Sequence, residues 1–210
     1  MTTILGICKE INGKSEVFCS SDSRATLGGE ILDVSERKMV LFPNFVVMFT
    51  GLATQTHVIK EMSQDKSFLR QNCCKMRNAE DASNFGKAMM GNLKYALEHS
   101  PDVNSGSDSR LIICTPTEVY SVDNYFYAYS PRFICDGSGG LFSQGWLEGI
   151  YDDIETVEDM EREVRKAMQI SAMKDSGTGG EIHLLHVTRD VLPEPPATKR
   201  KIVKVKKEDE

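Results

Sequence analysis

The hydrophobic pattern of this chain alternates between two periods, and this alternation restricts the fold more than any other feature. Apolar residues recur first at every second position, as in half-buried strands, and then at every third or fourth position, as along one face of a helix. The pattern predicts strands, two helices, more strands, two more helices and a last strand. Such elements bury their apolar faces in layers, so we expect an α+β fold, a four-layer αββα sandwich.

The boundaries of the expected elements follow from the apolar runs and from turn signals between them. We expect strands at residues 2–8, 16–23, 29–34, 38–43, 45–51, 110–116, 118–123, 127–137 and 181–188, and helices at about 53–62, 79–99, 138–153 and 156–175. In the second helix one apolar stripe is formed by Phe85, Met89, Leu93 and Leu97.

Two local signals mark where elements turn or begin. Asn12-Gly13 stands between the first two strands, and this dipeptide favours a tight hairpin turn. Thr156, with Asp159 after it, is a capping pair that is typical of a helix start.

Composition limits the class of protein. The 210 residues are 40% hydrophobic and indicate one globular domain over residues 1–190, followed by a flexible tail at 191–210 that is rich in proline and charge. A formal net charge of -6 argues against a general nucleic-acid-binding protein. No apolar run approaches the length of about 20 residues that spans a membrane. The N-terminus lacks the features of a signal peptide, so we expect a cytoplasmic protein, with the nucleus as a second location in a eukaryote.

Metal, disulfide and nucleotide sites are not predicted. His183 and His186 lie three apart on an expected strand, so they point to opposite faces and cannot share a metal. The glycine-rich turns at 135–141 and 174–181 lack the lysine of a nucleotide loop. Six cysteines show no metal-ligand or disulfide spacing and are expected to be reduced, mostly core thiols: Cys8, Cys19, Cys73, Cys74, Cys114 and Cys135. We therefore expect neither a metal nor a cofactor.

The N-terminus admits two interpretations. Thr2 is small enough for an aminopeptidase to remove Met1, and the exposed threonine would carry a hydroxyl nucleophile and a free α-amine as base. The alternative is that "TTILGI" is only the start of a strand, because β-branched residues suit a pleated surface.

Small polar motifs follow at the ends of the expected elements. Asp22 and Arg24 end the second strand, Lys38 begins an apolar strand, and Gly51 separates a strand from a helix. A Gly-Ser-Gly segment and an Asp-x-x-Thr-Gly-Gly segment come later, at 137–139 and 175–180. Each motif by itself is more typical of an ordinary structural feature than of a functional site: a solvated turn, a lysine at a strand edge, a packing glycine and two loops.

In their joint order, the motifs resemble the proteasome β-type family, the threonine peptidases of the N-terminal-nucleophile hydrolase fold. The resemblance runs from Thr2 to about Asp190, and its most specific part is "SDSRATLGG". It implies a four-layer sandwich of that type and a peptidase that hydrolyses peptide bonds through an N-terminal threonine.

The resemblance also implies a role for each matching residue. Thr2 matches the nucleophile, Asp22 and Lys38 match the buried charge pair beside it, and Gly51 matches the oxyanion-hole amide. The residues that orient the amine are matched by Ser138, Asp175 and Thr178. The family usually has serine at the last of these positions. We expect the Thr178 hydroxyl to keep the hydrogen bond, although its extra methyl can shift it.

The chemistry of this set is consistent with those roles. A threonine hydroxyl needs an adjacent base, and a free α-amine has a pKa of about 7.7 to 8.0, close to neutral pH. The positive charge of Lys38 would favour the neutral amine and the developing alkoxide, while Asp22 compensates that charge. A glycine amide can approach the carbonyl oxygen closely as it becomes an anion.

Substrate contacts are implied by the same resemblance. The substrate-binding residues are expected to be Arg24, Ala25, Thr26, Glu36, Phe49 and Ala53, with His57 deeper in the pocket. Phe49 at the pocket floor would favour small or branched P1 side chains, whereas an inward Glu36 would favour a basic one. We expect a small neutral or apolar P1.

Three variants of the assignment remain open. Most members of the eukaryotic and archaeal 20S type carry a propeptide, whereas a single methionine before the threonine is typical of the bacterial HslV-type peptidase. The segments "SDSRAT" and "SGTGG" favour the 20S type, because HslV-like chains generally lack them. Silent β-type subunits that only build ring walls commonly lack Thr2, Asp22 or Lys38, all of which are present here.

Assembly into rings is implied as well. We expect rings of about six or seven β-type subunits per layer, with an α-type ring or an ATPase unfoldase as partner. Unfolded polypeptides would be the substrates, and no nucleic acid or membrane is expected as partner. The tail at 191–210 is either an unstructured end or an arm around a neighbouring subunit.

Overall fold

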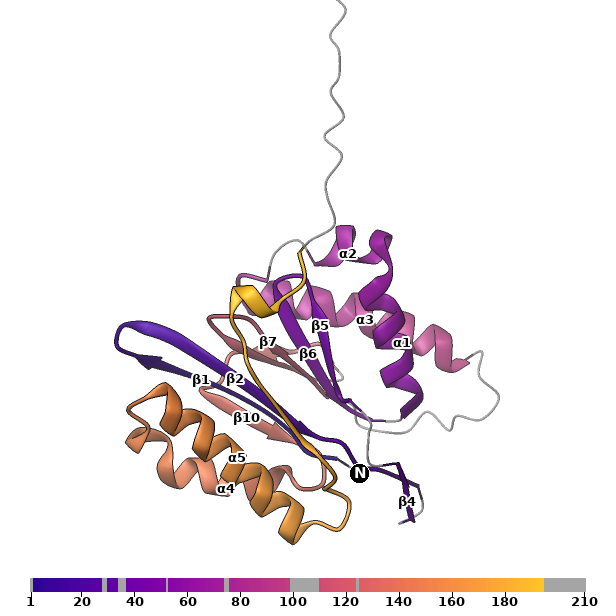
Figure 1. Cartoon of the computed structure of the whole chain (residues 1–210). Helices are drawn as coiled ribbons and strands as arrows, with labels where there is room; N and C mark the ends of the chain where they lie inside the picture. The colour runs from indigo at the N-terminus through magenta and orange to yellow at the C-terminus, as the bar shows by residue number, and fades with distance from the viewer. Residues whose placement is uncertain are drawn as a thin grey trace, which may run out of the picture.

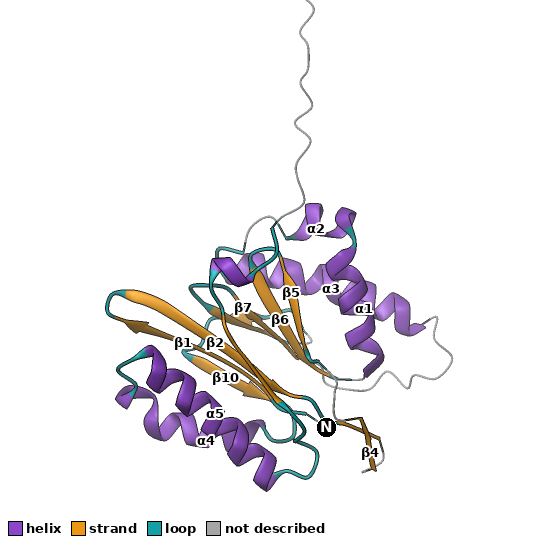
Figure 2. Cartoon of the chain, viewed as in Figure 1, coloured by secondary structure: helices purple, strands orange, loops and turns teal. Residues whose placement is uncertain are grey.

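In the computed structural model of this chain, two sheets pack face to face and helices cover the outer face of each sheet (Figure 1). The structure describes residues 2–27, 30–33, 37–51, 53–73, 76–98, 110–123 and 125–194. The predicted α+β fold with helix, sheet, sheet and helix layers is confirmed (Figure 2).

The first sheet carries the N-terminus. Its strands are antiparallel, in the order β10 (Phe133–Asp136), β1 (Ile4–Ile11), β2 (Lys14–Asp22) and β11 (Ile182–His186). The predicted hairpin joins β1 to β2, and Asn12 and Gly13 both have positive φ, at 52° and 73°. That backbone suits a two-residue turn between right-twisted strands, which explains the Asn-Gly sequence.

The second sheet consists of β5 (Met39–Phe42), β6 (Phe45–Thr50), β7 (Arg110–Cys114), β8 (Val119–Val122) and β9 (Ala128–Tyr129) in that order. A separate two-stranded ribbon contains β3 (Ala25–Leu27), which was not predicted, and β4 (Glu30–Asp33). The single strand expected at 127–137 is wrong. Pro131 has no N–H for a ladder, and the chain leaves the second sheet after β9 and enters the first as β10.

Helices α1 (Ala53–Gln64), α2 (Lys66–Asn72) and α3 (Ala79–Glu98) lie on the second sheet. The predictions missed α2, whose seven residues are too few to show a clear period. Its start is capped by the Asp65 carboxylate, which accepts hydrogen bonds from the amides of Ser67 and Phe68. On α3, Phe85, Met89 and Leu93 are buried as predicted, and the side chain of Leu97 lies outside the described residues.

The first sheet is covered by α4 (Gly140–Ile150) and α5 (Val157–Lys174), which a short 3-10 turn at Tyr151–Asp153 separates. The predicted cap of α5 is confirmed, because Thr156 Oγ1 accepts a hydrogen bond from the Asp159 amide at 3.0 Å. A second 3-10 turn, Arg189–Val191, follows β11.

Alternation along β6 shows how the layers are held together. Phe45, Val47 and Phe49 pack against the helices, while Val46 and Met48 pack against the first sheet. Cys8, Cys19, Cys114 and Cys135 carry free thiols, as predicted, and Cys74 lies outside the described residues. Within the described ranges, no three or more His, Cys, Asp or Glu residues are grouped to hold a metal, and no helix is long and apolar enough to cross a membrane.

Candidate active site

The sheets bring Thr2 to one end of the sandwich, where β1 begins and β2 ends (Figure 1). Ile4 pairs with Ser21, and the Asp22 amide donates to the Thr3 carbonyl at 3.1 Å. The antiparallel register therefore sets the carboxylate of Asp22 beside the first residues of the chain.

Asp22 is a buried acceptor on which five donors converge. Its Oδ1 accepts from Thr2 Oγ1 at 3.0 Å, from the Thr3 amide at 2.9 Å and from Lys38 Nζ at 2.5 Å. Its Oδ2 accepts from the amides of Gly179 at 3.0 Å and Arg24 at 3.3 Å. So many donors fix the orientation of this buried carboxylate.

Lys38 forms the predicted buried charge pair with Asp22. The exposed fractions of the two side chains are 8% and 1%. Lys38 Nζ also donates to the Arg24 carbonyl at 2.7 Å, which ties the end of β2 to the chain that leads into β5. A buried pair satisfied in this way is tolerated by the fold, whereas one charge left alone would be costly.

The backbone nitrogen of Thr2 faces a second polar group. Thr2 N donates to Ser138 Oγ at 3.3 Å, and Ser138 Oγ donates to Asp175 Oδ2 at 2.6 Å. Thr178 Oγ1 donates to the same oxygen at 2.6 Å, so the hydrogen bond expected of the threonine at this position is present. Burial would raise the pKa of Asp175, but the donors from Ser138, Thr178 and the Gly177 amide outweigh it and lower that pKa.

Thr3 belongs to this group and was missed by the sequence analysis. Its buried hydroxyl lies 2.6 Å from Thr178 Oγ1. Because Thr178 gives its only hydroxyl proton to Asp175, Thr3 must be the donor in this contact. A Cβ on Gly139 would lie 2.3 Å from Thr3 Oγ1 and 2.6 Å from Thr178 Oγ1, which explains the glycine there.

Gly51 follows the last residue of β6 and is exposed, with φ at 154°. The preceding residue, Thr50, donates from its hydroxyl to Asp136 Oδ2 at 2.5 Å, and Asp136 pairs with Ile4. These contacts bring Gly51 to the same end of the sandwich as Thr2. The predicted role of its amide in an oxyanion hole stays a prediction.

The expected substrate-binding residues are dispersed. Ala25 and Thr26 lie half-buried on β3. Arg24 donates to the Ser176 carbonyl at 2.8 Å, and its guanidinium packs so closely on Gly179 that a Cβ there would be 2.4 Å from it. Arg24 therefore links the end of β2 to the loop after α5, and its substrate contact stays a prediction.

Among the remaining pocket predictions, the substrate contacts of Phe49, Ala53 and Glu36 stay predictions. Phe49 is 3% exposed and packs between the second sheet and its helices. Ala53 begins α1, its side chain is not among those described, and Glu36 lies outside the described residues. The expectation that His57 lies deep in a pocket is wrong, because its side chain is 76% exposed and it pairs with Glu61 one helical turn away.

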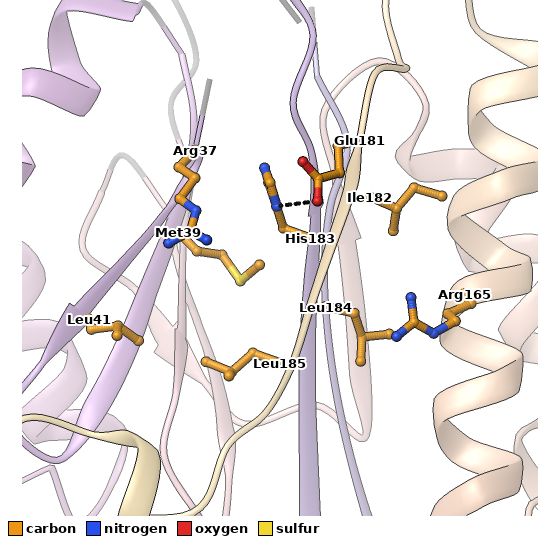
Figure 3. A pocket seen from close by; sticks show the side chains of 9 residues that line it. All are labelled: Arg37, Met39, Leu41, Arg165, Glu181, Ile182, His183, Leu184 and Leu185. Atoms are coloured by element: carbon orange, nitrogen blue, oxygen red, sulfur yellow. Dashed lines mark ion pairs between the residues drawn. The ribbon is translucent and has the colours of Figure 1, made fainter. Parts of the chain in front are cut away.

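A separate cavity of about 390 Å³ lies between the edge strands β5 and β11 (Figure 3). In Figure 3, His183 and Leu185 extend from β11 toward Met39 and Leu41 of β5, whereas Ile182 and Leu184 extend toward Arg165 of α5. Glu181, just before β11, lies 3.9 Å from His183 Nδ1. It is lined by Arg37, Met39, Leu41, Arg165, Glu181, Ile182, His183, Leu184 and Leu185. None of these belongs to the predicted catalytic set.

Comparisons of the sequence with protein families and with curated proteins both find proteasome subunits. The family model described as "Proteasome subunit" matches residues 2–187. A proteasome subunit beta from Nanoarchaeum equitans is 22% identical over 197 residues, which cover 90% of this chain and 94% of the relative. One from Methanobrevibacter ruminantium is 27% identical and covers 90% of this chain and 86% of the relative.

Two solved structures share the fold. Eukaryotic HslV from Trypanosoma brucei superposes with a TM-score of 0.60 at 19% identity, and Thiobacillus denitrificans BPH with 0.68 at 15%. In both comparisons 89% of this chain and 99% of the other are covered. At these sequence identities, the structural similarity shows a shared fold and nothing further.

Proposed function

This chain belongs to the proteasome subunit family, and from that premise we propose that it is a β-type threonine endopeptidase with Thr2 as its nucleophile. One observation carries the proposal: the hydroxyl of Thr2 and the ammonium of Lys38 both contact Oδ1 of Asp22 in a buried site. A buried charge pair costs desolvation energy. A subunit that only builds the ring wall gains nothing from such a pair beside its first threonine, whereas a catalytic subunit does.

The base is the α-amine that removal of Met1 would create on Thr2. Ser138 gives its hydroxyl proton to Asp175, so its lone pair accepts an N–H from Thr2. This contact holds one N–H of the amine and leaves the nitrogen lone pair to take the proton of Thr2 Oγ1 once the hydroxyl turns from Asp22 Oδ1, to which it donates here. The amine would be largely neutral just above its ordinary pKa of about 7.7 to 8.0.

Attack of Thr2 Oγ1 on the substrate carbonyl forms a C–O bond while the amine takes the hydroxyl proton. The carbonyl oxygen becomes an anion, which the Gly51 amide and the field of Lys38 would stabilise. Collapse breaks the C–N bond, and the proton held by the Thr2 amine goes to the leaving amine. Water, activated by the same amine, then hydrolyses the ester on Thr2 and restores the enzyme.

We propose that the chain works in a ring with other β-type subunits, capped by an α-type ring or an ATPase unfoldase. An uncaged peptidase with an open site would degrade unfolded chains throughout the cell. Native mass spectrometry of the purified protein, with and without co-expressed partners, measures the ring. A fully active monomer would contradict this part of the proposal.

Three preparations test the peptidase activity: protein trimmed to Thr2, Met1-retained protein confirmed by intact mass, and trimmed Thr2→Ala. All three should fold, because one residue at the start of β1 disturbs little packing. Only the first should hydrolyse fluorogenic peptides and gain the mass of a peptide epoxyketone. Met1-retained protein keeps its hydroxyl but has an amide nitrogen, which cannot accept the proton.

The outcomes separate the alternatives. A trimmed protein that assembles and yet neither hydrolyses peptides nor reacts with the epoxyketone would be a silent ring subunit. Met1-retained protein that is as active as the trimmed form would exclude the amine as base. Activity only on addition of an ATPase unfoldase, in a ring with no α-type subunit, would favour the HslV-type assignment.

A small neutral or apolar P1 residue is the proposed substrate preference. Phe49 is a large, buried side chain that cannot move aside without disturbing the packing of the helices on the second sheet. A panel of fluorogenic peptides that differ only at P1 measures the preference, and a strong preference for arginine would contradict it.

A further inference from the structure

We infer that Thr50 and Asp136 form a bridge between the two sheets that positions the amide of Gly51 relative to Thr2. The inference rests on the proposed function and adds two positioning residues to it. The inference gives a function to Thr50 and Asp136, which have no part in the catalytic steps proposed above.

The bridge joins the last residues of two strands. Thr50 ends β6 in the second sheet, and Asp136 ends β10 in the first. Thr50 is only 7% exposed, and its hydroxyl donates to Asp136 Oδ2 at 2.5 Å. Its acceptor is a carboxylate oxygen, and hydrogen bonds to ionised groups are stronger than those between neutral groups.

Arg110 supports the acceptor from the second sheet. It is the β7 residue in register with Thr50, and its guanidinium nitrogen lies 3.6 Å from Asp136 Oδ1. Asp136 therefore holds one partner on each of its oxygens, both from the second sheet. Both contacts therefore join Asp136 of the first sheet to residues of the second.

Each end of the bridge leads directly into a group of the proposed site. After Asp136 come Gly137, on which a Cβ would lie 2.2 Å from the Thr2 carbonyl oxygen, and Ser138, which accepts from Thr2 N. After Thr50 comes Gly51. Gly51 and Ser138 thus follow strands of different sheets, and their relative position depends on how those sheets are joined here.

The bridge matters for Gly51 because this residue lies beyond the end of β6 and outside the ladder of the second sheet. A glycine samples a wide range of backbone angles, so its amide direction depends on what fixes its neighbours. Misplacement of a catalytic group by about 1 Å can cost on the order of 100-fold in rate. Fixing Thr50 removes one source of that freedom.

Thr50→Val and Thr50→Ser test the inference in the trimmed, assembled protein. Valine has the shape of threonine without the hydroxyl, and serine keeps the hydroxyl. We expect Thr50→Val to lower kcat about tenfold or more with KM within about twofold, because an oxyanion donor acts on the transition state. Thr50→Ser should recover most of the lost kcat. Asp136→Asn keeps an acceptor oxygen, and its kcat should lie between those of the wild type and Thr50→Val.

A second measurement does not depend on activity. Structures of the assembled wild type and Thr50→Val should differ in the distance from Gly51 N to Thr2 Oγ1 by more than about 0.5 Å, a displacement large enough to matter for catalysis. Should Thr50→Val not fold, the same measurements are made on Asp136→Asn.

The outcomes keep the two proposals apart. If the wild type hydrolyses peptides through Thr2 but Thr50→Val has kcat within twofold, or Thr50→Ser is no better than Thr50→Val, the bridge does not position Gly51 and the proposed function still stands. If trimmed wild type is inactive, the proposed function fails, and the Gly51 to Thr2 distances alone decide on the bridge. Unchanged distances overturn it.

Discussion

Two polar groups flank Thr2, and they differ in burial and charge. On the hydroxyl side, Asp22 and Lys38 are a nearly unexposed ion pair, and five donors satisfy the carboxylate. On the nitrogen side, Ser138 is exposed and Asp175 half-buried, and neutral hydroxyls and one amide are the donors. Both groups contact the same residue, yet solvent reaches only one of them.

The difference separates what each group does for folding from what it does for chemistry. A buried carboxylate that loses its cation has no water to replace it, so a change on the hydroxyl side alters stability and activity together. On the nitrogen side water can replace a lost hydrogen bond, so activity can fall while the fold is kept. Substitutions on the two sides therefore test the comparison directly.

Lys38→Ala should have the largest effect. It removes the cation beside the buried Asp22 carboxylate, and we expect a loss of about 3 to 5 kcal/mol in unfolding free energy. Without the positive charge beside the alkoxide, kcat/KM should fall by about 1000-fold or more. Denaturant unfolding and peptide hydrolysis measure the two effects.

Lys38→Arg is the matched variant, since it keeps the charge and changes the shape. A planar guanidinium cannot occupy the site of a compact ammonium 2.5 Å from Asp22 and 2.7 Å from the Arg24 carbonyl, so activity should still be lost while less stability is lost. Near wild-type turnover in either variant would remove Lys38 from the mechanism.

Ser138→Ala should lower activity with almost no effect on the fold. The change removes the acceptor of Thr2 N, so the amine is less well oriented and kcat should fall about tenfold to a hundredfold. Because Ser138 is exposed, the unfolding free energy should stay within about 0.5 kcal/mol of the wild type. A stability loss as large as that of Lys38→Ala would contradict the proposed difference between the sides.

The lowered pKa of Asp175 predicts that the stability of the fold depends on pH. Its pKa is lowered from the ordinary value of 3.8, because donors from Ser138, Thr178 and Gly177 outweigh the effect of burial. A depressed carboxyl pKa stabilises the fold above the unfolded-state value and loses that contribution as pH falls through the folded-state value.

The stability difference between wild type and Asp175→Asn should therefore be constant near neutral pH and shrink as pH falls below about 3.8. Denaturant titrations at several pH values measure it. A difference that grows toward low pH would mean that burial, which raises the pKa, dominates at this site.

Thr178→Ser should have the smallest effect. Serine is the usual residue of the family here and keeps the hydroxyl that bonds Asp175 and receives the Thr3 proton. We expect kcat within about twofold, and a stability loss of about 1 kcal/mol from the buried methyl. Thr178→Val is the control: it keeps the volume, removes the hydroxyl and should lower kcat clearly more than serine does.

The sequence by itself determined the layers and identified the polar residues that gather around Thr2. The change of hydrophobic period located most strands and helices, Asn12-Gly13 set the first turn, and Thr156 set the start of α5. The resemblance to the family implied two groups around Thr2, and the members of each group do contact one another in the structure: Asp22 with Lys38, and Ser138 and Thr178 with Asp175. The elements, the turn and the cap are readable because burial and capping depend on neighbours a few residues away, whereas the site residues were identified only through the resemblance to the family.

Only the tertiary structure decided how these groups are linked. It revealed the Thr3 contact with Thr178, the bridge of Thr50 to Asp136 and the division of 127–137 between two sheets, and it placed His57 in solvent. Thr3 lies 175 residues from Thr178, and Thr50 lies 86 from Asp136. Hydrogen bonds are directional and short-ranged, so pairs this distant in sequence are fixed by strand register and sheet packing, which no local pattern of residues encodes.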